Sequence, residues 1–246
     1  MNSIFYHGWY WLVTFICVTG HFFLGLFCIF TPNFFKYNRK FARLCIKIIA
    51  KSMRLNVEAH GLDRIPKNHA CIFMANHSSL IDIVVMTIAI PYHFNFIAKK
   101  ELFWVPFIGL QMLFGGDFLI NRSDPRQAKK CLNKVQKRLR KGWNMLIFPE
   151  GTRSSDGQIL DFKRGAFKLA FDSNATIIPC YIEGSGDIVQ KKSLKASPGT
   201  VKIHFDYPIP TKELSKDKAQ MMQILQFTRN KIKSLKLTAE TSPPLN

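Results

Sequence analysis

The first 35 residues of the chain carry no charged side chain, and this stretch restricts the fold more than any other feature of the sequence. Met1–Phe35 contains no lysine, arginine, aspartate or glutamate, and Trp9–Phe30 is almost wholly apolar and aromatic. A helix of that length crosses roughly 30 Å of hydrocarbon, the thickness of a bilayer core. A cleaved signal peptide fits poorly, because the chain start lacks positive charge and no small-x-small site follows the apolar run. A buried core helix is the alternative, but so long a run without a charge counts against it.

A basic amphipathic pattern follows Pro32. At helical spacing the cations of this stretch fall within about 120° of arc, and apolar side chains cover the opposite side. The cations are Lys36, Arg39, Lys40, Arg43, Lys47, Lys51 and Arg54, and the apolar residues are Phe34, Tyr37, Phe41, Leu44, Cys45, Ile48, Ile49 and Met53. Such a helix lies in a membrane interface with its cations near lipid phosphates. An ordinary surface helix packed on the domain is the alternative, but it would mix acids with bases, and no acid precedes Glu58.

The basic run also predicts how the chain is arranged about a membrane. Cations that follow an apolar segment favour the cytoplasmic side, so we expect the rest of the chain on the cytoplasmic face of a membrane, the inner membrane in a bacterium. The first segment either spans the bilayer or dips into one leaflet and pairs with the second as a hairpin. We therefore expect a membrane-associated two-helix segment over residues 1–55, an α/β domain over 56–237 and a disordered tail over 238–246.

The formal net charge of +19 implies an anionic partner. Nucleic acid is not expected, because the basic residues concentrate in the interfacial segment and no zinc finger, RRM or helix-turn-helix pattern occurs. Anionic membrane lipids and a phosphorylated substrate remain. The six cysteines are scattered without a CxxC pair or a Cys/His cluster, which argues for a reduced compartment and against a metal site or a disulfide framework.

After residue 55, short apolar runs alternate with helical patterns, which predicts a three-layer α/β domain. The predicted strands are Val57–His60, Ala70–Ala75, Phe94–Ala98, Asp117–Asn121, Asn144–Phe148, Thr176–Ile182 and Val201–Asp206. The predicted helices are Leu80–Ile90, Pro125–Lys141, Arg164–Asp172 and Lys218–Lys236. Ligands of such domains collect where strands end and loops lead into helices, so these strand ends are the places to look for a site.

His77 lies at one such strand end, before a helix whose start Ser78 or Ser79 marks. An imidazole on such a turn is accessible to substrate, and its ordinary pKa lies near working pH. With His77 in the turn and Asp82 in the first helical turn, the chain can fold the carboxylate back to the ring, which makes a histidine base held by an acid. Plain capping is the alternative for Asp82, because Ser79 and Asp82 have the spacing of a capping box.

Phe148–Ser154 ends another strand in a glycine turn that carries Glu150 and Arg153. Backbone N–H groups and a guanidinium suit a phosphate monoester, although a plain surface turn is as good a reading of this segment alone. Lys99, Lys100 and Arg122 close two further strands and can add charge to the same pocket. The other histidines, which lack a nearby acid at a strand end, are expected to be structural or exposed: His7, His21, His60, His69, His93 and His204. The motifs of serine hydrolases, zinc peptidases and nucleotide-binding folds do not occur.

Taken together, these segments resemble the motif blocks of the glycerolipid acyltransferases. Asn76-His77 with Asp82 is similar to the NHxxxxD block, and Phe148–Arg153 is similar to the FPEGTR block. Gly116–Arg122 and Ile178-Pro179 resemble the two other blocks, in the right order and spacing. By size and layout, the chain is most similar to the bacterial type of 1-acylglycerol-3-phosphate (lysophosphatidic acid) acyltransferase. The resemblance implies an α/β fold with a mixed, mainly parallel sheet covered by helices, preceded by the membrane-binding helix pair.

The resemblance also implies a reaction and residue roles. His77 would act as general base, oriented by Asp82, on the sn-2 hydroxyl of lysophosphatidic acid. The acyl donor would be acyl-CoA or acyl carrier protein, and the product phosphatidic acid. No cofactor or metal is implied, because the thioester is already activated. The expected substrate-binding residues are Lys99, Arg122, Glu150, Gly151, Thr152 and Arg153. The same chemistry on another lysophospholipid, an ornithine-type lipid or glycerol 3-phosphate is the alternative.

Overall fold

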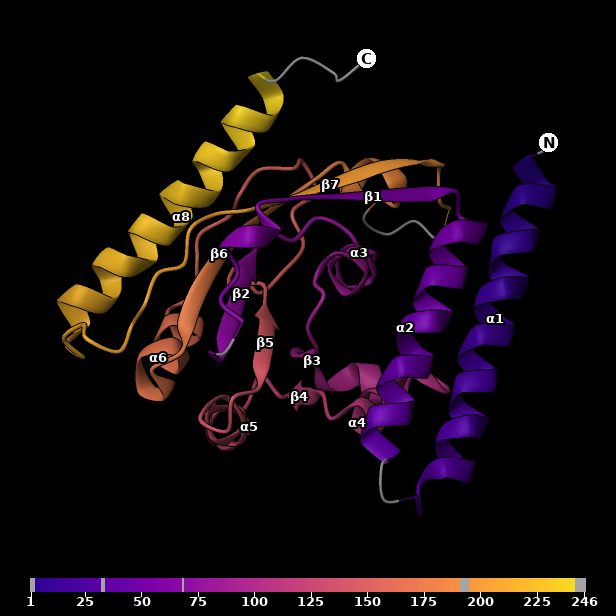
Figure 1. The fold of residues 1–246 in the computed structure, drawn as a ribbon, viewed down its shortest axis with the longest axis horizontal. Coiled ribbons are helices and arrows are strands. Elements are labelled where there is room, and N and C mark those ends of the chain that lie inside the picture. The colour runs from indigo at the N-terminus through magenta and orange to yellow at the C-terminus, as the bar shows by residue number, and fades with distance from the viewer. Residues whose placement is uncertain (1–2, 32–33, 68, 191–194, 242–246) are drawn as a thin grey trace.

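The computed structural model describes residues 3–31, 34–67, 69–190 and 195–241, and a seven-stranded sheet lies at its centre (Figure 1). The strand order is β1-β7-β6-β2-β5-β3-β4, and every neighbouring pair is parallel except β6 with β7. The strands are β1 (Leu55–His60), β2 (Cys71–Ala75), β3 (Phe94–Lys99), β4 (Phe118–Ile120), β5 (Asn144–Ile147), β6 (Thr176–Glu183) and β7 (Gly199–Phe205). This confirms the predicted mixed, mainly parallel sheet, and each predicted strand lies within two residues of an observed one.

Eight α-helices and two short 3-10 helices join these strands in the described part of the chain. The α-helices are α1 (Ser3–Cys28), α2 (Phe34–Ser52), α3 (Asp82–Ala89), α4 (Ile108–Gly115), α5 (Pro125–Leu139), α6 (Arg164–Ser173), α7 (Ser185–Ile188) and α8 (Lys218–Thr241). The 3-10 helices are η1 (Leu62–Arg64) and η2 (Lys100–Trp104). Asp124 caps α5 through its side chain, with Pro125 at the first helical position, as the sequence predicts.

The two faces of the sheet bury separate apolar clusters, because side chains alternate along a strand. Cys71 and Phe73 of β2 face α3 and the inner sides of α1 and α2. Ile72 and Met74 face α5, α6 and α8. All of β2 is buried, which is expected for the central strand of a sheet covered on both faces. Helices thus cover both faces of the sheet. Because β2, β5, β3 and β4 are parallel neighbours, their carboxyl ends lie along the same edge.

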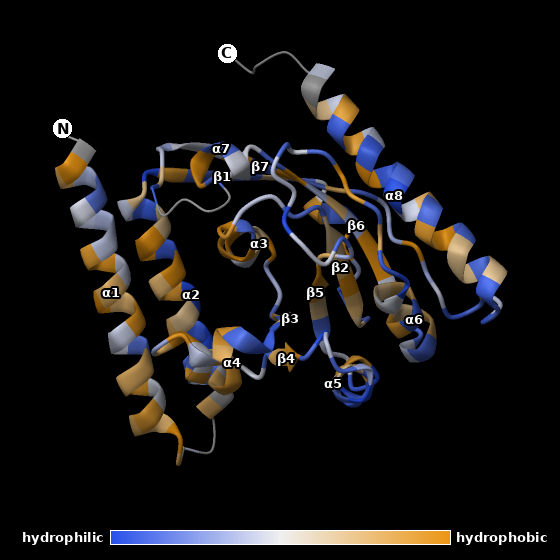
Figure 2. Ribbon diagram, turned by 180° about the vertical axis from the view of Figure 1, so that it is seen from behind, coloured by the Kyte–Doolittle hydropathy of each residue, from blue (hydrophilic) through white to orange (hydrophobic). Residues whose placement is uncertain are grey.

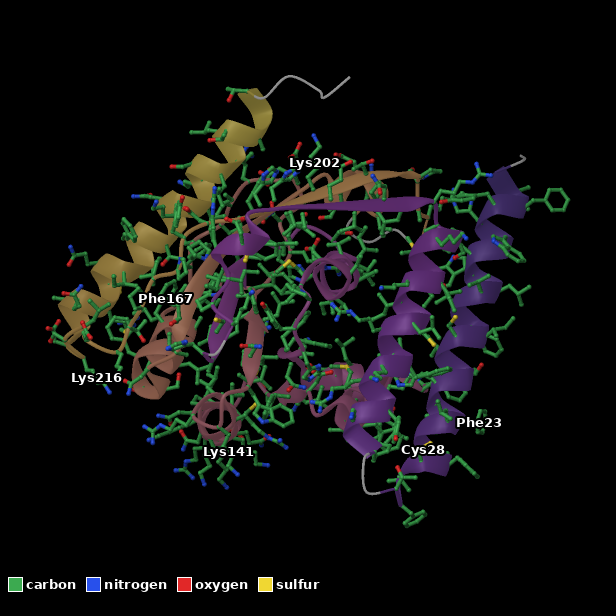
Figure 3. All side chains as sticks on the ribbon, viewed as in Figure 1. Phe23, Cys28, Lys141, Phe167, Lys202 and Lys216 are labelled. Carbon is green, nitrogen blue, oxygen red and sulfur yellow. The ribbon has the colours of Figure 1, made fainter. Side chains whose placement is uncertain are left out.

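The helix α1 is apolar and long enough to cross a membrane. Its inner side is nevertheless part of the protein core: the Tyr6 hydroxyl donates a hydrogen bond to the Met53 carbonyl at 2.7 Å, and the Tyr10 hydroxyl accepts one from the Ala196 N–H at 3.2 Å. The outer side exposes large apolar side chains, among them Phe23, which Figure 3 labels, and Figure 2 shows hydrophobic residues along the helix. The predicted two-helix segment is therefore present, and it shares its core with the α/β domain.

The basic side of α2 divides between the domain and the surface. Arg43 donates to the carbonyls of Thr87 and Pro91 at the end of α3, and the Arg39 guanidinium lies 5.1 Å from the ring centre of Trp143. These two arginines pack on the domain, which is the alternative reading of the basic pattern. The lysines of α2 remain exposed and lie beside exposed apolar side chains. The lysines are Lys36, Lys40, Lys47 and Lys51, and the apolar neighbours are Tyr37, Leu44 and Ile48.

The end of the chain differs from its prediction. The helix α8 continues to Thr241, so residues 238–241, which the sequence assigns to a disordered tail, are helical. The apolar side chains of Leu235 and Ala239 pack against the core cluster under α8, which explains the extension. The rest of that predicted tail, residues 242–246, lies outside the described residues.

Candidate active site

His77 and Asp82 are in direct contact at the carboxyl end of β2. The Nδ1 atom of His77 lies 2.7 Å from Oδ2 of Asp82, which is the first residue of α3. The carboxylate is fully buried, whereas the His77 side chain keeps 20% of its surface exposed. Because the buried carboxylate accepts from Nδ1, that nitrogen carries the proton and the Nε2 lone pair is left for a ligand. The ring is thus both oriented and accessible.

The same carboxylate oxygen also fixes the loop before α3. Oδ2 of Asp82 accepts the backbone N–H groups of Ser78 at 2.9 Å and Ser79 at 3.0 Å. The serine side chains do not cap the helix, contrary to the sequence prediction: α3 begins at Asp82 after Ile81, without a side-chain cap. The Ser79 hydroxyl donates instead to the Val189 carbonyl at 2.6 Å. Only half of the expected capping box is formed, because the serine side chains tie the loop to the neighbouring segment after β6.

The Phe148–Ser154 turn holds His77 from the other side. The rings of His77 and Phe148 stack with centres 4.1 Å apart and planes 12° apart. The His77 N–H donates to Oε1 of Glu150 at 3.0 Å, and the His77 carbonyl accepts the Ser154 N–H at 2.7 Å. Ring, amide and carbonyl of His77 therefore all have fixed partners. This precision suits a group that must meet a substrate hydroxyl at one position.

Glu150 supports the loop and does not face a ligand. Its side chain is 2% exposed, and its second oxygen, Oε2, accepts the Leu160 N–H at 3.2 Å. Burial raises the pKa of Glu150 to about 7, because a charged carboxylate is poorly solvated there. The sequence predicts Glu150 as a substrate-binding residue, whereas in this structure both of its carboxylate oxygens accept backbone N–H groups. Glu150 lies in the turn that follows β5, and its side chain points inward, so the carboxylate meets the two backbone amides.

The phosphate-binding candidates gather around Gly151. Gly151 has a φ of +72°, a conformation that favours glycine, and a Cβ at this position would lie 3.0 Å from the Lys163 ammonium. The Arg122 guanidinium donates to the Gly151 carbonyl. Thr152 is exposed and Arg153 is half-exposed in the same turn. The cationic side chains of Arg122, Arg153 and Lys163 thus belong to this turn or contact it, beside His77.

Two lysines stand near this edge of the sheet, one predicted as a site residue and one not. Lys99 ends β3, where it pairs in register with Ile120 of β4, and its ammonium lies 3.5 Å from the exposed Glu101 carboxylate. It therefore stands on the same sheet edge as Arg122, at the outer side of the group. Lys163 was not predicted as a site residue. It precedes α6, and its segment closes on the turn through a 2.8 Å bond from the Lys163 N–H to the Pro149 carbonyl. Its sequence signal was the segment Phe162-Lys163-Arg164-Gly165, which also resembles glycerolipid acyltransferase sequence.

Two polar residues, Asn76 and Asp117, have structural roles that the sequence did not predict. Asn76 exchanges two hydrogen bonds with the backbone of Ile182 at 2.9 and 2.7 Å, which joins the ends of β2 and β6. Asp117 accepts from the Asn95 side chain and the Phe96 N–H, both at 3.1 Å, where β3 leaves β5 and pairs with β4. Burial raises the pKa of Asp117 to about 7. Both residues hold the strand ends in register.

One other histidine has an acidic partner that the sequence did not reveal. His204 of β7 lies 2.9 Å from the Glu183 carboxylate of β6, because these antiparallel strands pair Tyr181 with His204. The expectation that His204 has no nearby acid is therefore wrong. Within the described ranges, no three His, Cys, Asp or Glu side chains gather where they could hold a metal ion.

Comparison with known proteins gives concordant matches. The Acyltransferase family model matches residues 56–183. The chain is 32% identical over 199 residues to the chloroplastic 1-acyl-sn-glycerol-3-phosphate acyltransferase BAT2 of Brassica napus, covering 79% of this chain and 56% of that protein. It is 32% identical over 181 residues to the human 1-acyl-sn-glycerol-3-phosphate acyltransferase alpha, covering 73% and 64% respectively. The chain thus spans somewhat more than half the length of these curated relatives.

The fold is similar to that of a solved bacterial structure, the 1-acyl-sn-glycerophosphate (LPA) acyltransferase PlsC from Thermotoga maritima. The TM-score is 0.79 at 23% identity, with 95% of this chain and 96% of that chain covered. The likeness therefore includes the N-terminal helix pair as well as the sheet. Since the family model covers more than half of the chain and includes His77, Asp82 and the Gly151 turn, the chain belongs to the Acyltransferase family.

Proposed function

We propose that the chain transfers a fatty acyl group from acyl-CoA or acyl carrier protein to the sn-2 hydroxyl of lysophosphatidic acid, giving phosphatidic acid. One observation carries the proposal: the 2.7 Å contact between His77 and the buried Asp82 leaves the second ring nitrogen accessible beside a cationic glycine turn. The names of the relatives, 1-acyl-sn-glycerol-3-phosphate acyltransferases, support lysophosphatidic acid as the acceptor.

The reaction needs a general base, which we assign to His77. Nε2 of His77 takes the proton from the acceptor hydroxyl while the oxygen of that hydroxyl attacks the thioester carbonyl carbon. The tetrahedral intermediate collapses, the carbon–sulfur bond breaks, and the leaving thiolate takes the proton from the imidazolium. Asp82 stabilises that imidazolium and keeps the ring in one tautomer. General-base catalysis contributes about 10²–10⁴ of the rate, and positioning of the two lipid-derived reactants contributes much of the remainder.

The cations around Gly151 are proposed to bind the acceptor phosphate. Arg122, Arg153 and Lys163 come from three different segments and meet at one turn, where a phosphate monoester can receive several charge-assisted hydrogen bonds. Glu150 takes no part in this contact, and its proposed role is to hold the His77 amide. Lys99 adds charge from the outer side of the pocket.

The packing of α1 favours the single-leaflet arrangement over a bilayer-spanning one. The α/β domain contacts α1 near its start through Tyr6 and Tyr10, and near its end through Phe22, whose ring lies 5.2 Å from that of Phe107. A helix bound along its length to a water-soluble domain cannot cross the hydrocarbon without taking that domain with it. We therefore propose that α1 lies in one leaflet of the cytoplasmic face, with the lysines of α2 near anionic headgroups.

The most direct test of the function is a product analysis with the purified full chain. The protein receives a mixed pool of lyso-acceptors, including lysophosphatidic acid, glycerol 3-phosphate and an ornithine-type lyso-lipid, with acyl-CoA or acyl carrier protein as donor. Mass spectrometry should detect phosphatidic acid as the dominant new product. Exclusive acylation of another acceptor would refute the assignment of lysophosphatidic acid, and the absence of any acylated product would refute the enzyme.

The leaflet arrangement has its own test. A protease site is placed before Ser3 in protein bound to the outside of sealed vesicles, and protease is added outside. Complete cleavage is expected if α1 lies in the outer leaflet. Protection of the site, with cleavage only after detergent, would show instead that α1 crosses the bilayer.

A further inference from the structure

A group of exposed apolar side chains on η2 and α4 has no role in the function proposed above. We call this group the η2–α4 patch; it consists of Leu102, Trp104, Val105, Ile108, Leu110 and Leu113. Trp104 is 80% exposed and is the most exposed member. A soluble surface rarely exposes so many large apolar side chains together unless the surface binds a partner.

The fold enforces this exposure. A Cβ on Gly109 would lie 2.0 Å from the Phe103 carbonyl oxygen, so the backbone of η2 is folded directly against α4. Phe107, which precedes α4, has a φ of +64°, a conformation that is uncommon for a bulky residue. The inner side of α4 is anchored by the buried Met112. The segment between Phe103 and Gly109 is therefore a tight unit that directs Trp104 into solvent, and the patch is not the product of a loose loop.

The η2–α4 patch is continuous with the apolar outer side of α1. Phe22 of α1 makes an edge-to-face contact with Phe107 at 5.2 Å and stacks with Phe114 at 6.5 Å. The Gln111 side chain donates to the Val18 carbonyl of α1. In Figures 1 and 2, α4 lies beside the end of the α1–α2 pair that carries the apolar C-terminal part of α1. The two apolar surfaces thus meet along α1.

The same segment leads directly into the site. The helix η2 begins at Lys100, immediately after β3 ends at Lys99 on the carboxyl edge of the sheet. Both lysines are exposed, so two cations precede the apolar patch along the chain, on the sheet edge where β4 leads to Arg122. Tryptophan and leucine next to exposed lysines are typical of a surface that rests in the boundary between lipid headgroups and acyl chains.

We propose that the η2–α4 patch is a second membrane contact, which inserts Trp104 into an anionic phospholipid bilayer next to α1 and sets the mouth of the site against the lipid surface. A lyso-acceptor then enters from the bilayer without passing through water. The proposal rests on the proposed function for its substrate. A second copy of the chain would also cover an apolar patch, but continuity with α1 and the adjacent lysines favour the bilayer.

The test compares one acceptor in two physical forms. Trp104→Glu and a matched control, Phe227→Glu, which alters an exposed aromatic residue on α8 on the other face of the sheet, are assayed with long-chain lysophosphatidic acid in phosphatidylglycerol vesicles and with a short-chain, monomeric analogue. We expect Trp104→Glu to lower the vesicle rate by about tenfold or more and to leave the monomeric rate within about twofold. The control should change neither rate, and vesicle flotation should persist because α1 remains.

Equal losses on both acceptor forms would overturn the proposal, as would no loss on vesicles. Conversion of a dimer to a monomer by Trp104→Glu, together with equal losses, would identify the patch as a contact between two copies and would also overturn it.

A second measurement does not depend on turnover. The chain has four tryptophans. Three of them, Trp9, Trp11 and Trp143, are replaced by phenylalanine in the inactive His77→Ala background, so that Trp104 alone fluoresces. Lipids brominated near the headgroup should quench this fluorescence, and lipids brominated at the chain end should quench it less. Absence of quenching by either lipid would overturn the proposal even if the enzyme acts as proposed, whereas quenching without any acyl transfer by the wild-type chain would refute the function alone.

Discussion

The His77–Asp82 pair and the cations around Gly151 lie side by side, but they are built in opposite ways. His77 is fixed through its ring, its amide and its carbonyl, and Asp82 is fully buried beneath it. Arg122, Arg153 and Lys163 are long side chains at the surface of the same edge. The proposed base is therefore held in place before any ligand arrives, whereas we expect the side chains of the proposed phosphate-binding group to adjust when the ligand binds.

This contrast predicts how variants divide between kcat and KM. Loss of a fixed group removes an interaction that matters at the transition state, so kcat falls. Loss of a surface cation weakens capture of the acceptor, so its KM rises. Five predictions follow from this division, beginning with the largest effect.

The His77→Ala variant should lose acyl transfer almost completely. The general base alone accounts for about 10²–10⁴ of the rate, and the ring also defines where the hydroxyl approaches. Rates are measured with the purified protein, and folding is checked by thermal unfolding and vesicle flotation. The matched control is His60→Ala, an exposed histidine on β1, which should keep wild-type activity. Normal turnover by His77→Ala would remove the basis of the comparison.

The Asp82→Asn variant should lower kcat by about 10²–10³ and leave the acceptor KM within a few-fold. An amide in this position cannot stabilise the imidazolium, although its oxygen can still accept the Ser78 and Ser79 amides. Thermal unfolding separates catalysis from stability: kcat should fall by far more than any loss of folded protein at the assay temperature can explain. If kcat stays unchanged while thermal stability falls, Asp82 is a capping residue only.

The fold could be predicted from the sequence where one physical signal dominated. Short apolar runs bounded by turn residues defined β2 and β5, since central strands are buried on both faces. The helices η2 and α4 could not be found in this way. From Phe103 to Phe114, which covers the end of η2 and most of α4, apolar residues occur both on the side that contacts α1 and on the exposed side. The segment therefore shows no helical periodicity of apolar and polar residues.

The site could be predicted as a set of segments but not as a set of orientations. Asp82 is five positions after His77, and a single turn geometry brings them together, so local reasoning was sufficient. The role of Glu150 depends on whether its side chain points toward the ligand or toward the loop. The Leu160 N–H decides this orientation, and Leu160 lies ten residues later in a segment without regular secondary structure. For His204, strand pairing supplied the acid, and pairing is not visible in one sequence.

The Glu150→Gln variant should lower kcat by about tenfold to a hundredfold with little change in acceptor KM. The amide keeps one acceptor for the His77 N–H but presents a donor to the Leu160 N–H, so the loop that carries the ring is loosened. A large rise in acceptor KM with normal kcat would contradict this and would return Glu150 to the phosphate pocket. Rescue of kcat by Glu150→Asp is not expected, because the shorter side chain cannot reach both amides.

Glu150 also gives a stability prediction with a defined sign. Its folded-state pKa of about 7 lies above its ordinary value of 4.5, so the protonated form favours the fold. The contribution to stability is complete below pH 4.5 and is lost as pH rises through 7, with an upper limit of about 3 kcal/mol. Glu150→Gln does not titrate, so its melting temperature relative to wild type should rise from pH 5 to pH 8. A constant difference would show that burial does not raise this pKa.

The Arg153→Ala variant should raise the acceptor KM by about tenfold or more at nearly constant kcat, as expected for the loss of one charge-assisted hydrogen bond. Lys163→Ala should have a similar but smaller effect, because a lysine makes a point contact where an arginine can bind two oxygens. The control is Arg140→Ala; Arg140 follows α5 directly, and its guanidinium donates to the Asp172 carbonyl of α6. An unchanged KM for Arg153→Ala would show that the phosphate binds elsewhere.

Lys99→Ala should have the smallest effect, a rise in acceptor KM of about twofold, because this lysine is exposed and already faces Glu101. Salt provides the sharper measurement. At physiological ionic strength, exposed charges are screened beyond about 8 Å, so the difference between Lys99→Ala and wild type should vanish as salt is raised, while that of Arg153→Ala persists. A tenfold effect that resists salt would place Lys99 in direct contact with the phosphate. The proposed phosphate-binding cations would then extend along the sheet edge from β5 to β3. Lys99 would bind the ligand directly, so its position would have to be as well defined as that of the His77–Asp82 pair.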